Sequence, residues 1–428
     1  MKRKLLITAS LAISLLTAVA QNPTNGRIRC YSTEHAEWLN SQDPNLKMQS
    51  ENDAKKFQEW SQSRAALRTN STNTIITIPV VVHVVYSNTT QNLSTAQILS
   101  QIDVLNEDFA KMNADTVNIP AVFRPDASAT QFQFCLAKQD PTGAMTDGIE
   151  RRQTTVTSFS TNNNVKHYSS GGLNAWDVNR YMNIWVCNMG NGILGYAQFP
   201  TTVHSNNYGV VIQYDSFGRI GTVSAPYDLG RTLSHEIGHC FNLIHIWGDD
   251  GNACSGSDSI ADTPNQASET YGCNTFPKYD ACSGSSTNGI MFMDYMDYGD
   301  DNCLIMFTRQ QSTRMLDALT LFYPTLITST GCQEVVNNIN SPSALQFSVY
   351  PNPTDGILNI EMFANKVLGD KLNVQITDII GKIVFEQEIG QSNGQTYQVD
   401  MSAFENGSYF ATVYNQSYKK TVKFVLNR

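Results

Sequence analysis

The sequence predicts an α+β fold, in which one long helix packs on a mixed β-sheet and a small all-β sandwich follows. Three observations support this prediction. A β-branched, almost wholly apolar run at 78–86 is typical of a buried strand, and an amphipathic segment at 95–112 is typical of a helix. After residue 344 the sequence changes to short alternating runs separated by turns, which indicates a separate sandwich.

The first domain is expected to hold one helix between several strands. Ser94 can cap the helix, whose apolar residues share one face: Ile98, Ile102, Leu105 and Phe109. Three further apolar runs are expected to be strands: 132–136, 182–186 and 208–214. Because strands lie before and after the helix, the sequence predicts a mixed sheet with the helix packed on it.

Composition and charge exclude two classes of protein. The chain has 428 residues, 41% hydrophobic and 16% charged, which is enough for two or three domains with a large core. Its net charge of −9 argues against binding to nucleic acid, because no excess of cations is available to neutralise phosphates. No run reaches the ~18 consecutive apolar residues of a membrane span, so no transmembrane segment is expected.

The first 20 residues have the form of a secretory signal peptide. A basic start at 2–4 precedes a short apolar stretch at 5–16, and small residues at 18 and 20 fit a cleavage site before Gln21. An uncleaved anchor is the alternative.

Export permits disulfides, and the nine cysteines leave at least one without a partner inside the chain.

A metal-binding pattern lies at 235–245. The run HEIGH at 235–239 places two histidines four residues apart, and on a helix these share one face. A third histidine, His245, follows six residues later, so the chain must turn near Asn242 with the left-handed backbone that Asn tolerates. The alternative is a helix with buried, hydrogen-bonded histidines. The remaining histidines are expected to be ordinary: His35, His83, His167 and His204.

This pattern predicts hydrolysis of peptide bonds in proteins or peptides. Neutral imidazoles from His235, His239 and His245 suit zinc and leave one position open for water. Zinc lowers the pKa of that water toward about 7, and Glu236 can take its proton and pass it to the leaving amine. The alternatives are a non-catalytic surface adhesin that retains the zinc fold and a zinc hydrolase of other substrates.

The motif and its surroundings resemble a known family over residues 76–325. The spacing at 235–245 is similar to the extended zinc signature of the metzincins, and residues 294–303 with 306–310 resemble the Met-turn region of the pappalysins. The resemblance implies a metzincin-like catalytic domain and a secreted zinc metalloendopeptidase. It also implies that Met296, rather than Met293, forms an apolar floor beneath the zinc and that Tyr298 stabilises the oxyanion.

The same resemblance implies structural calcium and two disulfides. Calcium would bind in the loop after the zinc helix through Asp258, Asp262 and Thr263, whose oxygens suit this ion. Solvated surface acids are the alternative. The four cysteines of this region by themselves allow three pairings. The resemblance implies Cys254–Cys282 and Cys273–Cys303.

The C-terminal segment resembles a different family. Residues 350–356, with 378–382 and 406–409, are similar to the sorting domain of the type IX secretion system. The resemblance implies the type IX machinery as a partner. It also implies a protein that is exported through the periplasm and outer membrane and is then secreted or attached to the cell surface. A carbohydrate- or protein-binding module is the alternative.

These observations divide the chain into five segments. Residues 1–20 are the expected signal peptide, and the polar residues 21–72 are an expected propeptide, with a disordered tail as the alternative. Residues 73–326 form the expected catalytic domain. Residues 327–344, rich in Ser, Thr, Asn and Pro, are an expected linker, and residues 345–428 are the expected sandwich.

Cys30 is the only cysteine of the expected propeptide. A thiolate binds zinc strongly and can displace the catalytic water, so we expect Cys30 to hold the zymogen latent. Arg29 can then pair with an acidic group of the cleft. An incidental thiol, or a disulfide to Cys332 or another unpaired cysteine, is the alternative.

Acidic residues after the Met-turn bear on specificity. Asp297, Asp300 and Asp301 follow Met296, and the resemblance places this region beside the pocket just beyond the scissile bond. Their charge predicts a preference for a basic residue after the cut.

Overall fold

The computed structural model describes residues 26–65, 74–251, 253–283, 288–334, 346–363, 372–390, 396–415 and 419–428. The chain divides into two compact units, residues 1–334 and 335–428. The expected signal peptide lies outside the described residues.

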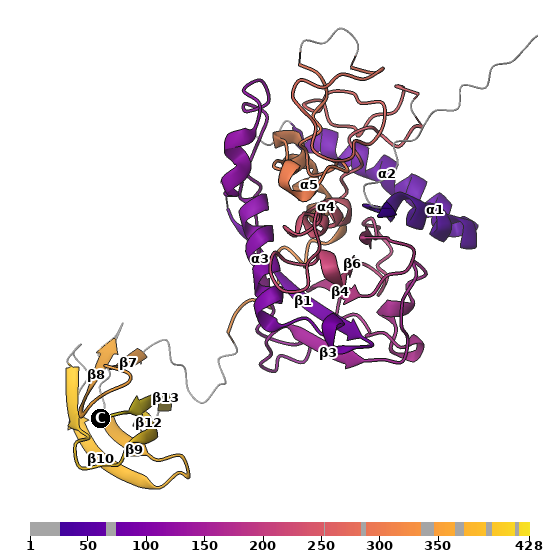
Figure 1. Cartoon of the computed structure of the whole chain (residues 1–428). Helices are drawn as coiled ribbons and strands as arrows, with labels where there is room; N and C mark the ends of the chain where they lie inside the picture. Colours follow the sequence, from indigo (N-terminus) through magenta and orange to yellow (C-terminus); the bar gives the residue numbers. More distant parts are fainter. Residues whose placement is uncertain are drawn as a thin grey trace, which may run out of the picture. The chain divides into compact units, whose positions relative to one another are not determined.

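A six-stranded mixed sheet forms the centre of the first unit (Figure 1). Its strands are β1 (Ile76–Tyr86), β2 (Phe132–Leu136), β3 (Ile149–Gln153), β4 (Met182–Cys187), β5 (Gly195–Ala197) and β6 (Val210–Gln213). Strand β1 pairs in parallel with β2 and β3 along one edge and with β4 along the other. Strand β6 is parallel to β4, and β5 closes the sheet antiparallel to β6. The expected mixed sheet is therefore confirmed, although β6 is shorter than the expected strand at 208–214.

Strand β1 is buried on both faces, which explains its almost continuous apolar sequence. Its alternate residues Ile78, Val80 and Val82 belong to the main hydrophobic core. Val81 and Val85 point to the opposite face, where loop segments cover the sheet. A strand buried in this way shows no alternation of polar and apolar residues.

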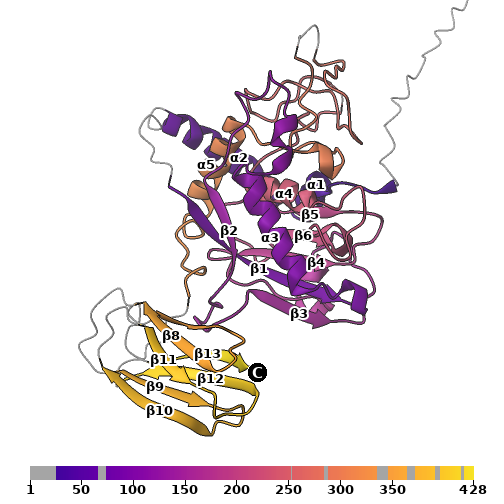
Figure 2. The same cartoon turned by 60° about the vertical axis from the view of Figure 1, so that its left-hand side comes forward.

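Five helices belong to this unit: α1 (Ser32–Gln42), α2 (Pro44–Ala65), α3 (Thr95–Phe109), α4 (Arg231–Cys240) and α5 (Arg309–Phe322). Helices α3 and α4 contact each other and the sheet, and α3 crosses in front of the strands in Figure 2. The side chain of Ser94 accepts a hydrogen bond from the backbone N–H of Gln97, as its expected capping role requires. Helix α3 ends at Phe109, earlier than expected, and the chain leaves through the left-handed residue Lys111.

Short 3-10 helices connect these elements: Thr89–Gln91, Ala114–Asn118, Asn164–Lys166, Tyr168–Ser170, Tyr214–Ser216 and Asp301–Cys303.

Helices α1 and α2 occupy the expected propeptide, where the sequence analysis assigned no regular structure. Helix α2 packs on α5, with the rings of Phe57 and Phe322 6.1 Å apart. Its buried Asp53 accepts a hydrogen bond from the backbone N–H of Thr202 at 3.0 Å. The segment is therefore held to the rest of the unit by specific contacts, although most of its surface is polar.

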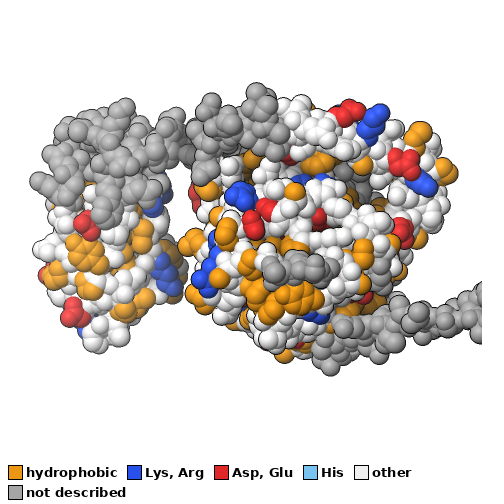
Figure 3. Space-filling view, turned by 90° about the horizontal axis from the view of Figure 1, so that it is seen from above, with side chains coloured by type: hydrophobic (Ala, Val, Ile, Leu, Met, Phe, Trp, Pro, Cys, Tyr) orange, Lys and Arg blue, Asp and Glu red, His pale blue; other side chains and the backbone are white. Residues whose placement is uncertain are grey.

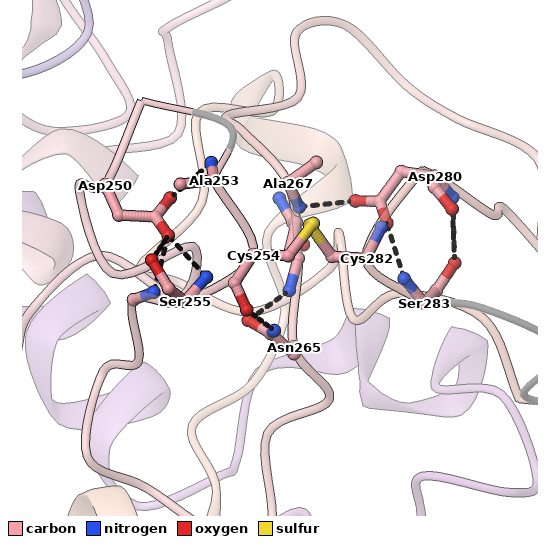
Figure 4. Close-up of a disulfide and its surroundings, with 11 residues drawn as sticks. Asp250, Ala253, Cys254, Ser255, Asn265, Ala267, Asp280, Cys282 and Ser283 are labelled. Atoms are coloured by element: carbon pink, nitrogen blue, oxygen red, sulfur yellow. Dashed lines mark hydrogen bonds between the residues drawn. A yellow bond between two sulfur atoms is a disulfide. The ribbon is translucent and has the colours of Figure 1, made fainter.

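The described residues between α4 and α5 form an irregular region that two disulfides hold together. The disulfides are Cys254–Cys282 and Cys273–Cys303, the pairing that the family resemblance implies. Figure 4 shows the first of these bonds between two aspartate-centred turns. Asp250 accepts hydrogen bonds from Ser255 and Gly256, and Asp280 accepts them from Cys282 and Ser283.

A third disulfide joins Cys135 to Cys332 and moves the boundary of the catalytic unit. The backbone of Gly331 also accepts a hydrogen bond from Lys138 at 2.7 Å. Residues 327–334, expected to begin the linker, thus belong to the first unit. The bond uses the cysteine that was the alternative partner of Cys30, and Cys30 is a free thiol.

The second unit consists of two antiparallel sheets. One contains β9 (Leu372–Thr377), β10 (Ile383–Gly390), β12 (Gly407–Tyr414) and β13 (Lys419–Leu426), and the other contains β7 (Gln346–Tyr350), β8 (Ile357–Phe363) and β11 (Thr396–Asp400). Residues alternate between buried and half-buried along β9, as one face against a core requires. The expected all-β domain is confirmed.

The described helices include none that is both long and apolar enough to span a membrane. On the face seen in Figure 3, acidic and basic side chains are interspersed rather than gathered into one basic patch.

Candidate metal centre and active site

Helix α4 carries three functional side chains into the core of the unit. His235, Glu236 and His239 are all fully buried. Arg231, in the first turn of the helix, forms an ion pair with Asp108 at 2.8 Å that anchors α4 to α3. The helix is thus fixed in position before it presents its histidines.

The chain reverses at Asn242, where the sequence predicts a left-handed residue. Asn242 has φ 73°, and the backbone N–H of Leu243 bonds to the carbonyl of Gly238 at 2.8 Å. This turn brings His245 back to the helix. The Nε2 atom of His239 lies 3.1 Å from the Nε2 atoms of both His235 and His245.

The other ring nitrogen of each histidine has an acceptor. The Nδ1 atom of His235 lies 2.6 Å from the carbonyl oxygen of Tyr295, and that of His239 lies 2.9 Å from the carbonyl of Leu243. The Nδ1 atom of His245 lies 2.8 Å from the Asp249 carboxylate. Nδ1 is therefore the protonated nitrogen in each ring, and three Nε2 lone pairs point at one another.

Three such lone pairs repel one another unless a cation lies between them, so the residues fit a metal ion. Burial lowers the pKa of His239 to about 3, which keeps its imidazole neutral, the form that binds a metal. Imidazole nitrogens suit zinc at about 2.0–2.1 Å, and nitrogens bound tetrahedrally at that distance are roughly 3.4 Å apart. Neither Asp249 nor the Tyr295 carbonyl was expected from the sequence as a partner of these histidines, although an acid four residues after His245 was a usable signal.

Glu236 lies beside this cluster. Its Oε2 atom accepts a hydrogen bond from the Ser32 hydroxyl at 2.7 Å. Its Oε1 atom is buried, and the carboxyl also interacts with the Cys30 thiol. Burial raises the pKa of Glu236 to about 7, a value that suits a group exchanging protons near neutral pH.

Met296 and Tyr298 surround the histidines from the Met-turn region. A Cβ atom at Gly238 would lie 2.5 Å from the Met296 sulfur, so this helix position has no room for a side chain. The ring centroid of Tyr298 lies 5.0 Å from that of His245, and its hydroxyl lies 3.4 Å from the carbonyl oxygen of Cys30. Burial raises the pKa of Tyr298 well above its ordinary value, so the phenol stays protonated and can donate.

Cys30 completes the cluster. Its Sγ atom and one nitrogen from each of His235, His239 and His245 all lie within 4.8 Å of one another. Among the described residues this is the one group of three or more histidine, cysteine or acidic side chains close enough to share a metal ion.

The segment around Cys30 makes main-chain hydrogen bonds with residues 192–195, which lead into β5. The backbone N–H of Ile28 bonds to the carbonyl of Gly192 at 2.9 Å, and Leu194 donates to the carbonyl of Ile28 at 2.9 Å. Tyr31 donates to the carbonyl of Gly195 at 3.0 Å. The bridge between Ile28 and Ile193 is parallel, so main-chain pairing holds Cys30 at the metal centre.

Arg29 pairs with an acidic group of the cleft, as the sequence analysis expected. Its guanidinium lies 2.6 Å from the Asp301 carboxylate, and both side chains are fully buried. The ring of Tyr227 lies beside the guanidinium at 5.2 Å. Asp297 is instead occupied by hydrogen bonds from Thr270, and Asp300 is only partly buried.

The three expected calcium ligands do not converge in this structure. Asp258 accepts a hydrogen bond from the Thr263 hydroxyl at 2.8 Å. Asp262 instead faces the start of α5, where it accepts hydrogen bonds from Thr308 and Gln310. The Asp262 carboxylate is thus used to fix that helix terminus.

Comparisons with known proteins agree with this site. Residues 166–320 match the family described as pregnancy-associated plasma protein-A, and residues 348–427 match a secretion system C-terminal sorting domain. An extracellular metalloprotease of Colletotrichum graminicola is 32% identical over 272 residues, which cover 61% of this chain and 82% of the relative. An extracellular metalloprotease of Arthroderma otae is 29% identical over 275 residues, which cover 62% of this chain and 86% of the relative.

Two solved structures from Tannerella forsythia are also similar. Mature mirolysin in complex with a cleaved peptide is 50% identical, with a TM-score of 0.59, and the match covers 63% of this chain and 100% of that one. A promirolysin mutant is 45% identical, with a TM-score of 0.65, and the match covers 72% and 99% of the two chains.

Fold, histidine cluster and relatives together define a metalloendopeptidase. The chain belongs to the pregnancy-associated plasma protein-A family, the pappalysins, and carries a type IX sorting domain at its C-terminal end. It is therefore a secreted enzyme that acts on peptide substrates and is exported by type IX secretion.

Proposed function

We propose that the enzyme is a zinc-dependent endopeptidase, made as a latent zymogen, that cuts proteins before basic residues. One observation carries the proposal. His235, His239 and His245 direct their Nε2 atoms into one buried cluster, with the buried Glu236 next to His235 and the Cys30 thiol within the cluster.

The three histidines would hold zinc, which supplies Lewis acidity that lowers the pKa of water and polarises a carbonyl. Glu236 takes the proton of the attacking water and then delivers it to the leaving amine, a role that its buried position beside the histidines supports. Tyr298 is buried, protonated and close to the histidines, so its hydroxyl can donate to the developing oxyanion.

The propeptide would block this chemistry at two points. Cys30 is a free thiol among the histidines, where it would fill the position that catalysis leaves to water. Ser32 donates a hydrogen bond to Glu236, so the base is engaged while the segment is in place. The pairing of residues 28–31 with 192–195 supports this arrangement.

Release of the propeptide would open a pocket for a basic side chain of the substrate. Arg29 now fills this pocket, and Asp301 is its fully buried partner. The second Asp301 oxygen accepts backbone N–H groups from Leu229 and Arg231, which fix the carboxylate. An uncompensated buried carboxylate strongly favours a cation, so Arg or Lys is expected directly after the scissile bond.

Cleavage of casein by the mature protein, with and without 1,10-phenanthroline, tests the proposed activity. We expect the chelator to abolish cleavage and zinc to restore it, with new N-termini beginning mainly at Arg or Lys. Zinc-loaded, folded protein that cuts no protein substrate would instead support the surface adhesin.

A further inference from the structure

A second arginine of the propeptide has its own acidic partner. Arg27 binds Asp215 with both ends of its guanidinium, at 2.7 and 3.2 Å. The two side chains are 25% and 16% exposed, so the pair is partly shielded from water. Within the described residues, Arg27 is the one side chain hydrogen-bonded to the Asp215 carboxylate. Removal of the propeptide therefore removes the one cation that is hydrogen-bonded to Asp215 among the described residues.

Asp215 and Asp301 bind the two arginines that flank Ile28, the residue that forms a parallel bridge with Ile193. Ile28 exchanges two backbone hydrogen bonds with residues 192 and 194, and the arginines on either side of it reach these two aspartates. Residues two apart in an extended strand point to the same side, about 6.6–6.8 Å from each other. Asp301 is thus the partner of the arginine next to Cys30 in the chain, and Asp215 is the partner of the arginine two residues before it.

We propose that Asp215 forms a second acidic subsite, which selects Arg or Lys two residues beyond the one that Asp301 binds. In a substrate these are the first and third residues after the scissile bond. The proposal rests on the function proposed above. The spacing of the subsites does not depend on the direction of the bound chain, because side chains of an extended peptide alternate in either direction.

The expected strength of the preference for a basic third residue follows from the solvent exposure of the Arg27–Asp215 pair. A bidentate contact between guanidinium and carboxylate is specific in geometry, but partial exposure to water weakens it. We therefore expect the third residue to alter kcat/KM by about three- to tenfold, less than the first residue, whose partner is fully buried. Salt should reduce this effect because the pair is not fully enclosed.

Peptides that carry Arg at the first position and Arg, Gln or Glu at the third test the subsite in the mature enzyme. We expect kcat/KM to fall in that order, with about a three- to tenfold span between Arg and Glu at low ionic strength. Asp215→Asn should reduce the span to less than about twofold, and Asp215→Lys should reverse the order. Asp126→Asn is the matched control, since Asp126 pairs with Arg309 in another loop and the span should persist.

The outcomes separate this inference from the proposed function. Efficient cleavage before the first Arg by wild-type enzyme that is indifferent to the third residue would overturn the Asp215 subsite alone. A span that persists in folded Asp215→Asn would overturn it as well, and would mean that the Arg27 contact serves only the propeptide. Failure to cut any of the peptides would count against the proposed function instead. Melting temperatures of the variants confirm that each is folded.

Discussion

The hydroxyl of Ser32 donates a hydrogen bond to the Oε2 atom of Glu236 at 2.7 Å. The same hydroxyl accepts the backbone N–H of Ala197 at 2.8 Å, so β5 holds it in place. Cys30, two residues earlier, lies among the histidines. One short segment thus reaches both the proposed metal ligands and the proposed base.

This arrangement predicts that latency has two separable parts. Cys30→Ala should shorten the lag before autoactivation by about tenfold or more, because the thiol is the direct ligand. Ser32→Ala should shorten it by about two- to tenfold, which corresponds to the ~0.5–1.5 kcal/mol of one typical hydrogen bond. Gels and peptide hydrolysis followed over time after purification measure the lag.

Ser41→Ala is the matched control, since the Ser41 hydroxyl is exposed and bonds to the carbonyl of Trp38 within its own helix. A Cys30→Ala proform that stays latent as long as the wild type would show that another group covers the metal. An unchanged lag in Ser32→Ala would mean that the Cys30 thiol alone maintains latency.

Specificity at the buried pocket depends on one charge. Asp301→Asn keeps an acceptor for the first turn of α4 but removes the negative charge that faces Arg29. We expect kcat/KM for peptides with Arg after the cut to fall by one to two orders of magnitude, roughly the effect of removing one partner of a buried charge pair. Peptides with Leu there should lose less than about threefold.

Asp300→Asn distinguishes this pocket from a general acidic environment, because Asp300 is partly exposed. It should leave the preference for Arg almost unchanged. Peptide sequencing that finds only apolar residues after the cut in wild-type digests would refute the pocket.

The spacing of the histidines and the left-handed turn could be predicted because both depend on local backbone geometry. His235 and His239 share a helix face, and Asn242 supplies the turn that returns His245. The contacts that tune the site come from distant segments. Tyr295 lies 60 residues from His235, and Ser32 lies 204 residues from Glu236, and no periodicity links such positions.

In the fold, too, the elements that depend on local sequence could be predicted, and the contacts between distant segments could not. Buried strands such as β1 are evident from their apolar runs. Helices α1 and α2 were missed because their sequence is polar and their contacts with the unit are few and specific, such as Asp53 with Thr202. The disulfide between Cys135 and Cys332 spans 197 residues, and spacing alone could not identify it.

Close packing beneath α4 predicts that Gly238 tolerates no side chain. A Cβ atom there would lie 2.5 Å from the Met296 sulfur, so Gly238→Ala should lower the free energy of unfolding by about 1–3 kcal/mol and reduce activity. Met296→Ala in the same chain should recover part of that loss, because it removes the clashing atom. Urea unfolding measures both effects.

Gly190→Ala serves as the comparison, since a Cβ atom there meets nothing closer than 3.8 Å. Equal stability of the Gly238→Ala and Gly190→Ala proteins would mean that the Met296 side chain moves aside at no cost.

Calcium binding remains a prediction, and thermodynamic linkage gives the direction of its effect on the stability of the folded protein. An ion that binds only the folded protein near Asp258 and Thr263 stabilises it by about 2.7 kcal/mol at one hundred times its dissociation constant. For a unit of this size the melting temperature should rise by about 2–4 °C per kcal/mol. Calorimetry on protein first stripped of calcium measures the shift, and Asp258→Asn should abolish it. An unchanged melting temperature in saturating calcium would exclude this site.

The most direct test of the central claim is the peptidase activity of mature Glu236→Ala, measured together with its zinc content. The three histidines remain in this variant while the base is absent, so we expect one zinc per chain, as in the wild type. Casein cleavage should fall by several orders of magnitude. Wild-type activity in Glu236→Ala, with zinc bound, would contradict the assignment of Glu236 as the base and the mechanism built on it.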